Sequence, residues 1–158
     1  ATMSTHSPRF WITIIRGLIM IKVTRSLIIN SNIEEIWQSI ADFGGVASFI
    51  NTIKKCTTEG ADGVGQLRHL ILDDNSLTTS RLTVLDHERH ILTYEIVITA
   101  LPMNNYTSTM KVEKTGTSSC KVSWCSRFEP SGVLPGKIED YIGAQLSTAL
   151  QNLKALHA

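Results

Sequence analysis

The stretch KIEDYIGAQLSTALQNLKAL, residues 137–156, decides the fold class of this chain. Its apolar residues recur at three- and four-residue spacing, which is the spacing of one face of an α-helix. These residues are Ile138, Ile142, Leu146, Leu150 and Leu153. Pro135 and Gly136 break the chain just before this stretch. The pattern predicts an amphipathic C-terminal helix about 30 Å long.

The chain before this helix has the period of β-strands. Short runs rich in β-branched and aromatic residues alternate with turns that contain Gly, Asp or Asn. The runs are residues 54–59, 65–72, 76–85, 91–99, 106–114 and 119–128. Strands joined by such short turns pair with their neighbours in sequence, so we expect an antiparallel meander.

The start of the domain combines one more strand with two short helices. IKVTRSLII, residues 21–29, is typical of a strand. Residues 30–32 offer helix N-caps, and apolar residues follow at helical spacing up to Ile40. The glycine pair 44–45 ends this helix, and residues 46–51 favour a second one. This order predicts an α+β fold, in which a curved seven-stranded antiparallel sheet wraps around the long C-terminal helix.

Composition excludes several classes of protein. Fifteen basic and fourteen acidic residues give a net charge of +1, and charged residues make up 18% of the chain. A disordered chain would need low hydrophobicity and high net charge, and a nucleic-acid-binding protein would carry a basic surface. Cys56, Cys120 and Cys125 show no CxxC spacing, so we expect reduced thiols and a cytoplasmic location.

The N-terminus raises the question of a targeting segment. Residues 10–21 are mostly apolar, but twelve residues are too few to span a bilayer. Arg16 interrupts the run, and no signal-peptide cleavage site follows it. We therefore interpret residues 1–19 as an N-terminal extension, or as the product of a start codon placed too early, and residues 20–158 as the domain. A peripheral amphipathic anchor is the alternative.

Metal and cofactor motifs are missing from the sequence. The five histidines match neither HExxH nor a zinc-finger spacing. Gly63-Val64-Gly65 lacks the rest of a phosphate-binding loop, so it is better explained as a turn. We expect no metal and no cofactor.

Several strings of this sequence resemble the Bet v 1/START-like superfamily, which is also called SRPBCC and has the helix-grip fold. They are SLIINSNIEEIWQSIADFGG (26–45), GVGQLRHLIL (63–72), RLTVLDHERHILTYEI (81–96), LPMNNY (101–106) and VSWCSRFEPSG (122–132). The chain looks most similar to bacterial members of the polyketide cyclase/dehydrase type. The resemblance implies a cavity for a hydrophobic small molecule between the sheet and the long helix. Members of the superfamily include cyclases and other lyases, lipid carriers and hormone receptors.

Side chains alternate between the two faces of a strand, and this parity selects the residues that face the helix. The candidate catalytic residues are Tyr106, Tyr94 and Arg68. A tyrosine can polarise a carbonyl, and an arginine can hold a carboxylate or enolate. The tyrosines could equally be cavity walls, and Arg68 a structural ion-pair partner. The expected ligand-binding residues are Leu70, Leu72, Thr78, Ser80, Leu82, Ile96, Met103, Ser108, Met110, Ser123, Tyr141 and Gln145.

The last strand has two registers that its sequence does not separate. Its own pattern favours Val122 and Trp124 on the inner face. The family register favours Ser123 and Cys125 instead. A β-bulge would reconcile the two.

The sequence leaves three functions open. The first is a module that binds a small hydrophobic or aromatic molecule, as a carrier, a sequestering protein or a sensor. The second is a polyketide cyclase- or aromatase-like enzyme acting on a carbonyl-containing substrate in the same cavity. The third is an interaction scaffold with a vestigial cavity. For partners we expect a small hydrophobic molecule, no nucleic acid and no membrane, and we leave open a homodimer.

Overall fold

The structure is a computed structural model, and it describes residues 19–158. The expected N-terminal extension therefore lies outside the described residues, apart from Ile19. Seven strands form one antiparallel sheet in the order β1-β7-β6-β5-β4-β3-β2. Their bounds are β1 Ile21–Ile29, β2 Ile53–Glu59, β3 Leu67–Leu72, β4 Leu77–Asp86, β5 Ile91–Ile98, β6 Met103–Gly116 and β7 Ser119–Pro130. The α+β class, the meander and the seven strands are confirmed.

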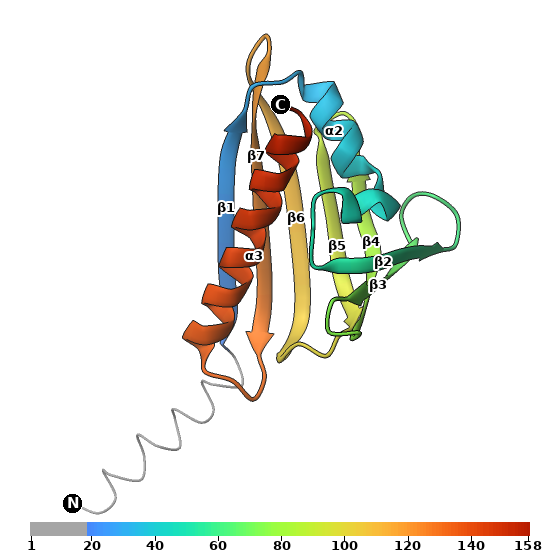
Figure 1. Cartoon of the computed structure of the whole chain (residues 1–158), viewed down its shortest axis with the longest axis vertical. Coiled ribbons are helices and arrows are strands. Elements are labelled where there is room, and N and C mark those ends of the chain that lie inside the picture. The colour runs from blue at the N-terminus through green and yellow to red at the C-terminus, as the bar shows by residue number, and fades with distance from the viewer. Residues whose placement is uncertain (1–18) are drawn as a thin grey trace, which may run out of the picture.

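The long C-terminal helix lies across the curved sheet, as Figure 1 shows. This helix, α3, runs from Pro135 to Leu156 and begins with a proline in its first turn, where the missing N–H costs nothing. Its apolar stripe packs on β1 and β7. Ile138, Ile142, Leu146, Leu150 and Leu153 are all buried, so the predicted face of the helix is the one that joins the core.

Two short helices close the end of the sheet opposite the start of α3 (Figure 1). The helix α2, Ile33–Ala41, is capped by Asn32, whose side-chain oxygen accepts from the Glu34 amide at 2.8 Å. The helix η1 is a 3₁₀ helix over Phe43–Ser48. It includes the glycine pair, so the prediction of a helix over residues 46–51 was wrong by three residues at each end. A 3₁₀ turn is a common connector of this length.

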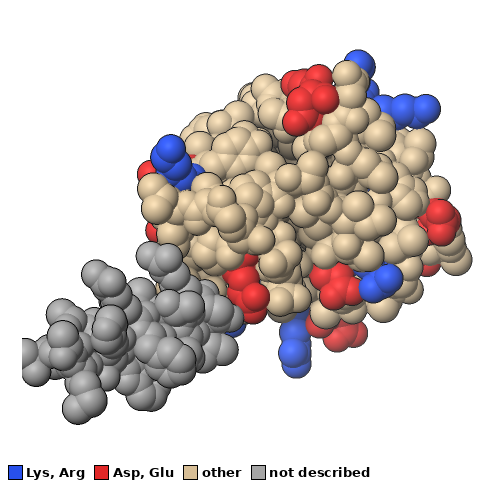
Figure 2. Space-filling model, turned by 90° about the horizontal axis from the view of Figure 1, so that it is seen from below, with Lys and Arg blue, Asp and Glu red and all other residues tan. Residues whose placement is uncertain are grey.

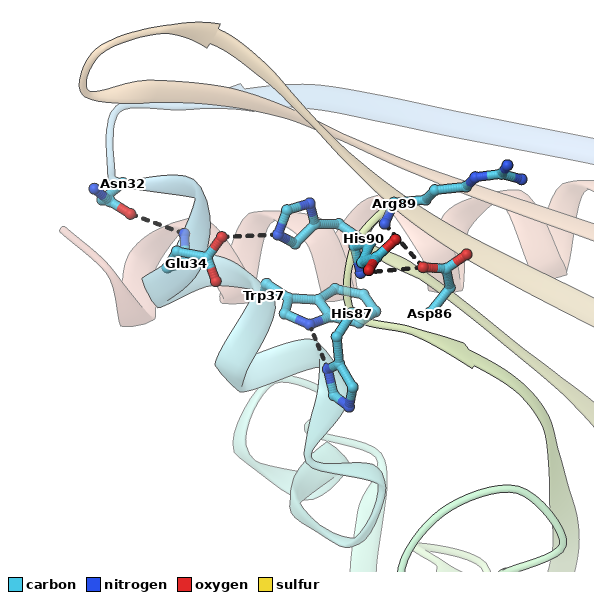
Figure 3. A network of polar contacts seen from close by, with 8 residues as sticks. Asn32, Glu34, Trp37, Asp86, His87, Arg89 and His90 are labelled. Atoms are coloured by element: carbon cyan, nitrogen blue, oxygen red, sulfur yellow. Dashed lines mark hydrogen bonds and ion pairs between the residues drawn. The ribbon is translucent and has the colours of Figure 1, made fainter.

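Figure 3 shows how α2 is joined to the turn between β4 and β5. The Trp37 indole Nε1 donates to His87 Nδ1 at 3.0 Å. His90 Nε2 lies 2.9 Å from a carboxylate oxygen of Glu34. The Asp86 carboxylate accepts from the amides of the next residues and shapes the turn. These contacts fix α2 against the end of the sheet at which the β4–β5 turn lies.

The described residues contain no helix that is both long and apolar enough to cross a membrane. Cys120 is buried, while Cys56 and Cys125 are partly buried, and all three are free thiols. Burial raises the pKa of the Cys56 and Cys120 thiols.

Candidate functional site

An apolar cavity of about 120 Å³ lies between the concave side of the sheet and α3. Strands β2 to β7, the segment before β2, the loop before β6 and one face of α3 supply its walls. The lining residues are Ile50, Thr52, Ile53, Leu70, Leu72, Thr78, Tyr94, Ile96, Leu101, Met103, Tyr106, Trp124, Tyr141, Ile142, Gln145, Leu146 and Ala149. The polar side chains among these residues carry hydroxyl groups, one amide and one indole. An apolar chamber with few polar groups is the usual composition of a small-molecule site.

Many of the predicted site residues lie on this wall. They come from β3, β4, β5, β6 and α3: Leu70, Leu72, Thr78, Tyr94, Ile96, Met103, Tyr106, Tyr141 and Gln145. Tyr141 is 43% exposed, which places it at the mouth of the cavity rather than in its depth. That these residues contact a ligand stays a prediction.

Other predicted site residues are buried on the inner face but do not line the cavity. Ser80, Leu82, Ser108 and Met110 point inward, as the parity predicted, and are covered by neighbouring side chains. Alternation says which face a residue takes. It does not say which part of that face stays open.

The inward position of Ser123 was wrong. Trp124 pairs with the inward-facing Met110, and Ser123 pairs with the exposed Lys111. The strand pattern that placed Val122 and Trp124 inside is therefore confirmed, and no bulge interrupts this part of β7. The family register, which favoured Ser123 and Cys125 inside, is therefore wrong for this chain.

The sequence reasoning missed the segment that precedes β2. Ile50 and Thr52 line the cavity from this segment, Ile53 does so as the first residue of β2, and Leu101 does so from the loop between β5 and β6. The only available signal was the apolar character of Ile50 and Ile53 next to a short helix.

Arg68 lies next to the cavity wall but is not part of it. Its Cζ atom sits 4.1 Å from the ring centroid of Phe43 and 4.5 Å from that of Tyr94. Its Nη1 donates to the Phe43 carbonyl at 3.1 Å, and its Nε has no hydrogen-bond partner. None of the acidic side chains in residues 19–158 forms an ion pair with it, so the structural ion pair considered for Arg68 is absent from that range. Burial lowers the pKa of this guanidinium.

Tyr106 is held by a chain of buried hydroxyl groups between β6 and β7. Its Oη lies 2.7 Å from Ser126 Oγ, which lies 2.9 Å from Ser108 Oγ. The Trp124 indole Nε1 donates to the same Ser108 Oγ at 2.7 Å. Burial, and to a smaller degree the neighbouring Tyr94, raises the pKa of Tyr106 well above its usual value. The phenol is therefore neutral and keeps its proton.

A larger polar groove of about 550 Å³ adjoins this cavity. It lies where β5 and β6 stop pairing beyond Glu95 and Thr107, and it shares Ile96, Met103 and Tyr106 with the cavity wall. Figure 2 views the molecule from the end where α3 begins, and charged side chains stand apart there in small groups on a mostly uncharged surface.

Comparison with known proteins matches the family model described as "Polyketide cyclase / dehydrase and lipid transport" to residues 20–158. The solved structure of XoxI from Bacillus cereus is similar at 26% identity with a TM-score of 0.80, over 86% of this chain and 94% of that one. The Zhui aromatase/cyclase from Streptomyces sp. R1128 is similar at 16% identity with a TM-score of 0.76, over 88% and 94%. Norcoclaurine synthase from Thalictrum flavum is similar at 16% identity with a TM-score of 0.70, over 87% and 86%. At 16% identity the last two support the helix-grip fold alone.

Proposed function

The chain belongs to the polyketide cyclase/dehydrase and lipid transport family, and we propose that it binds a hydrophobic molecule of about one aromatic ring in the cavity under α3. The cavity volume carries this proposal. An engineered apolar cavity of about 150 Å³ holds a benzene molecule, whereas drug-sized ligands occupy roughly 300–1,000 Å³. At about 120 Å³, the chamber matches the smaller class.

The chemistry of the wall supports an aromatic ligand that carries one polar group. Tyr94, Tyr106 and Trp124 offer ring edges and faces, and the aliphatic residues of α3 close the other side. Norcoclaurine synthase, which shares the fold, has been solved in complex with dopamine and hydroxybenzaldehyde. Each of these two molecules carries a single benzene ring. We take the same size class for the ligand here, with the chain acting as a carrier, sequestering protein or sensor in the cytoplasm.

A second candidate function is a cyclase- or aromatase-like enzyme acting on a carbonyl-containing substrate. Arg68 favours it, because a buried guanidinium without a carboxylate partner could stabilise the negative charge of an enolate. Two observations weigh against it. Tyr94 and Phe43 stand over the guanidinium, and a polyketide chain long enough to cyclise exceeds the volume of the cavity.

The experiment is a thermal unfolding series with acetophenone, using two matched variants of α3. Ala149 lines the cavity and Ala144 is exposed on the same helix. We expect the ligand to stabilise the wild type by about 2.7 kcal/mol at 100 times its Kd. Ala149→Leu should abolish this stabilisation by filling the chamber, and Ala144→Leu should retain it.

The same samples separate binding from catalysis. The binding proposal predicts that acetophenone is recovered unchanged after incubation. Equal stabilisation of the Ala149→Leu and Ala144→Leu variants, or none in the wild type, would contradict the proposed cavity function. A chemically altered ligand would favour the enzyme.

A further inference from the structure

A chain of buried, hydrogen-bonded side chains lies behind Tyr106. Ser108, Ser126 and Trp124 are fully or almost fully buried, and Tyr106 is 6% exposed. Ser108 and Ser126 face each other directly across β6 and β7. Trp124 and Tyr106 belong to the cavity wall, while the two serines lie behind it. The chain therefore runs from one wall residue to another through groups that solvent does not reach.

Trp124 fixes the polarity at one end of the chain. An indole N–H can only donate, so Ser108 Oγ must accept from Trp124 Nε1. The single proton of Ser108 then has two acceptors within reach. One is the Cys125 carbonyl at 3.3 Å, and the other is Ser126 Oγ at 2.9 Å.

This choice creates two proton arrangements. In the first, Tyr106 donates to Ser126, Ser126 donates to Ser108, and Ser108 donates to the Cys125 carbonyl. Every hydroxyl proton in this arrangement has an acceptor inside the protein. In the second, Ser108 donates to Ser126 and Ser126 donates to Tyr106, so the Tyr106 proton must find its acceptor elsewhere.

We infer that a carbonyl oxygen in the cavity selects the second arrangement, and that Ser126 is a positioning residue that makes Tyr106 a stronger donor to that oxygen. The reversal gives up only the long 3.3 Å bond to the Cys125 carbonyl. Hydrogen bonds in a chain polarise one another, so a phenol that accepts from Ser126 donates more strongly. The ligand class that follows is a one-ring aromatic ketone or aldehyde.

This inference rests on the proposed binding function, and a matched pair of probes tests the two separately. Acetophenone and α-methylstyrene have nearly the same shape, but only the ketone has an acceptor. A hydrogen bond of ordinary strength should make the wild type prefer the ketone by about fivefold in Kd. Tyr106→Phe should remove this preference, and Thr109→Val, which changes a side chain outside the cavity wall, should keep it.

The carbonyl stretching frequency of bound acetophenone reports on Ser126 itself. An infrared difference spectrum between carbonyl-¹²C and carbonyl-¹³C ligand isolates this band from the protein background. We expect the lowest frequency in the wild type, a higher one in Ser126→Ala and the highest in Tyr106→Phe. Thr109→Val is the control, because Thr109 is the neighbour of Ser108 on the outer face and bonds only to Thr93.

Three results would overturn the inference while leaving the binding function intact. The first is an equal frequency in the wild type and Ser126→Ala. The second is a band that moves down only when Ser126 is removed, which would mean that Tyr106 is locked on Ser126. The third is a ketone preference lost in Tyr94→Phe but kept in Tyr106→Phe. If neither probe binds any variant, the proposed function itself fails.

Discussion

Tyr106 shows at the scale of one residue how burial and hydrogen bonding shift a pKa in opposite directions. Its ring stacks on Phe128 with centroids 5.8 Å apart and an interplanar angle of 21°. Its hydroxyl bonds to Ser126. The apolar surroundings keep the phenol neutral, because a buried phenolate would lose its hydration, whereas the hydrogen bond to Ser126 lowers the pKa of Tyr106 and only partly offsets this effect. A neutral phenol is the form that can donate to a ligand.

The raised pKa of Tyr106 predicts a specific pH dependence of stability. Above the usual value of 10.0, the unfolded chain releases this proton while the folded protein keeps it. Rising pH therefore favours unfolding, and the stability contributed by Tyr106 is complete below pH 10 and lost above it. In the Tyr106→Phe variant the free energy of unfolding should therefore fall less steeply with rising pH, by up to about 1.4 kcal/mol per pH unit. Urea unfolding of both proteins between pH 9 and 11 checks this, and parallel pH curves would contradict it.

The sequence predicted which face of a strand each site residue occupies, but it did not predict the neighbours of that residue in space. The parity of β3 placed Arg68 inside and His69 outside, where His69 bonds to Thr79. That Phe43 and Tyr94 would stack on the guanidinium could not be predicted, because Phe43 comes from a helix 25 positions earlier. Long-range neighbours of this kind decide whether an inward residue reaches the cavity.

At the scale of elements, the strands and helices were predictable wherever hydrophobic period and turn residues agreed. The C-terminal helix and the meander are of this kind. The pattern of β7 favoured the correct face for Val122 and Trp124, but its inner face carries Ser126 and its outer face carries Cys125, so the alternation is weak and two registers stayed open. Pairing with β6 settles it by placing Trp124 beside Met110.

The contact between α3 and β1 gives a prediction for a helix glycine. A Cβ at Gly143 would collide with Arg25 Nη2, because the exposed Arg25 side chain occupies that space. Alanine stabilises a helix by about 1 kcal/mol over glycine. Gly143→Ala should raise the free energy of unfolding by this full amount in an Arg25→Ala background. With Arg25 present, the increase should be smaller. A double-mutant cycle by urea unfolding checks it, and equal effects in both backgrounds would refute the contact.

At the scale of the whole molecule, the distance between α3 and the sheet determines what the protein can bind. Large side chains such as Trp124, Leu146 and Ile142 hold the helix away from the strands, and small ones such as Ala149 leave space. No spacing rule in the sequence gives this distance, so the size of the cavity could not be predicted. In the structure the cavity has a volume of about 120 Å³, which is below the range of a typical ligand site.

Methyl NMR of the isoleucine and leucine residues during titration with acetophenone tests the central claim most directly. We expect the largest shift changes at Ile96, Leu101 and Leu146, which line the cavity. Ile28 and Leu134 are exposed and lie outside it, so their methyl signals should stay in place. Changes confined to exposed methyl groups, with those of Ile96 and Leu146 unmoved, would contradict the proposal that the cavity under α3 is the binding site.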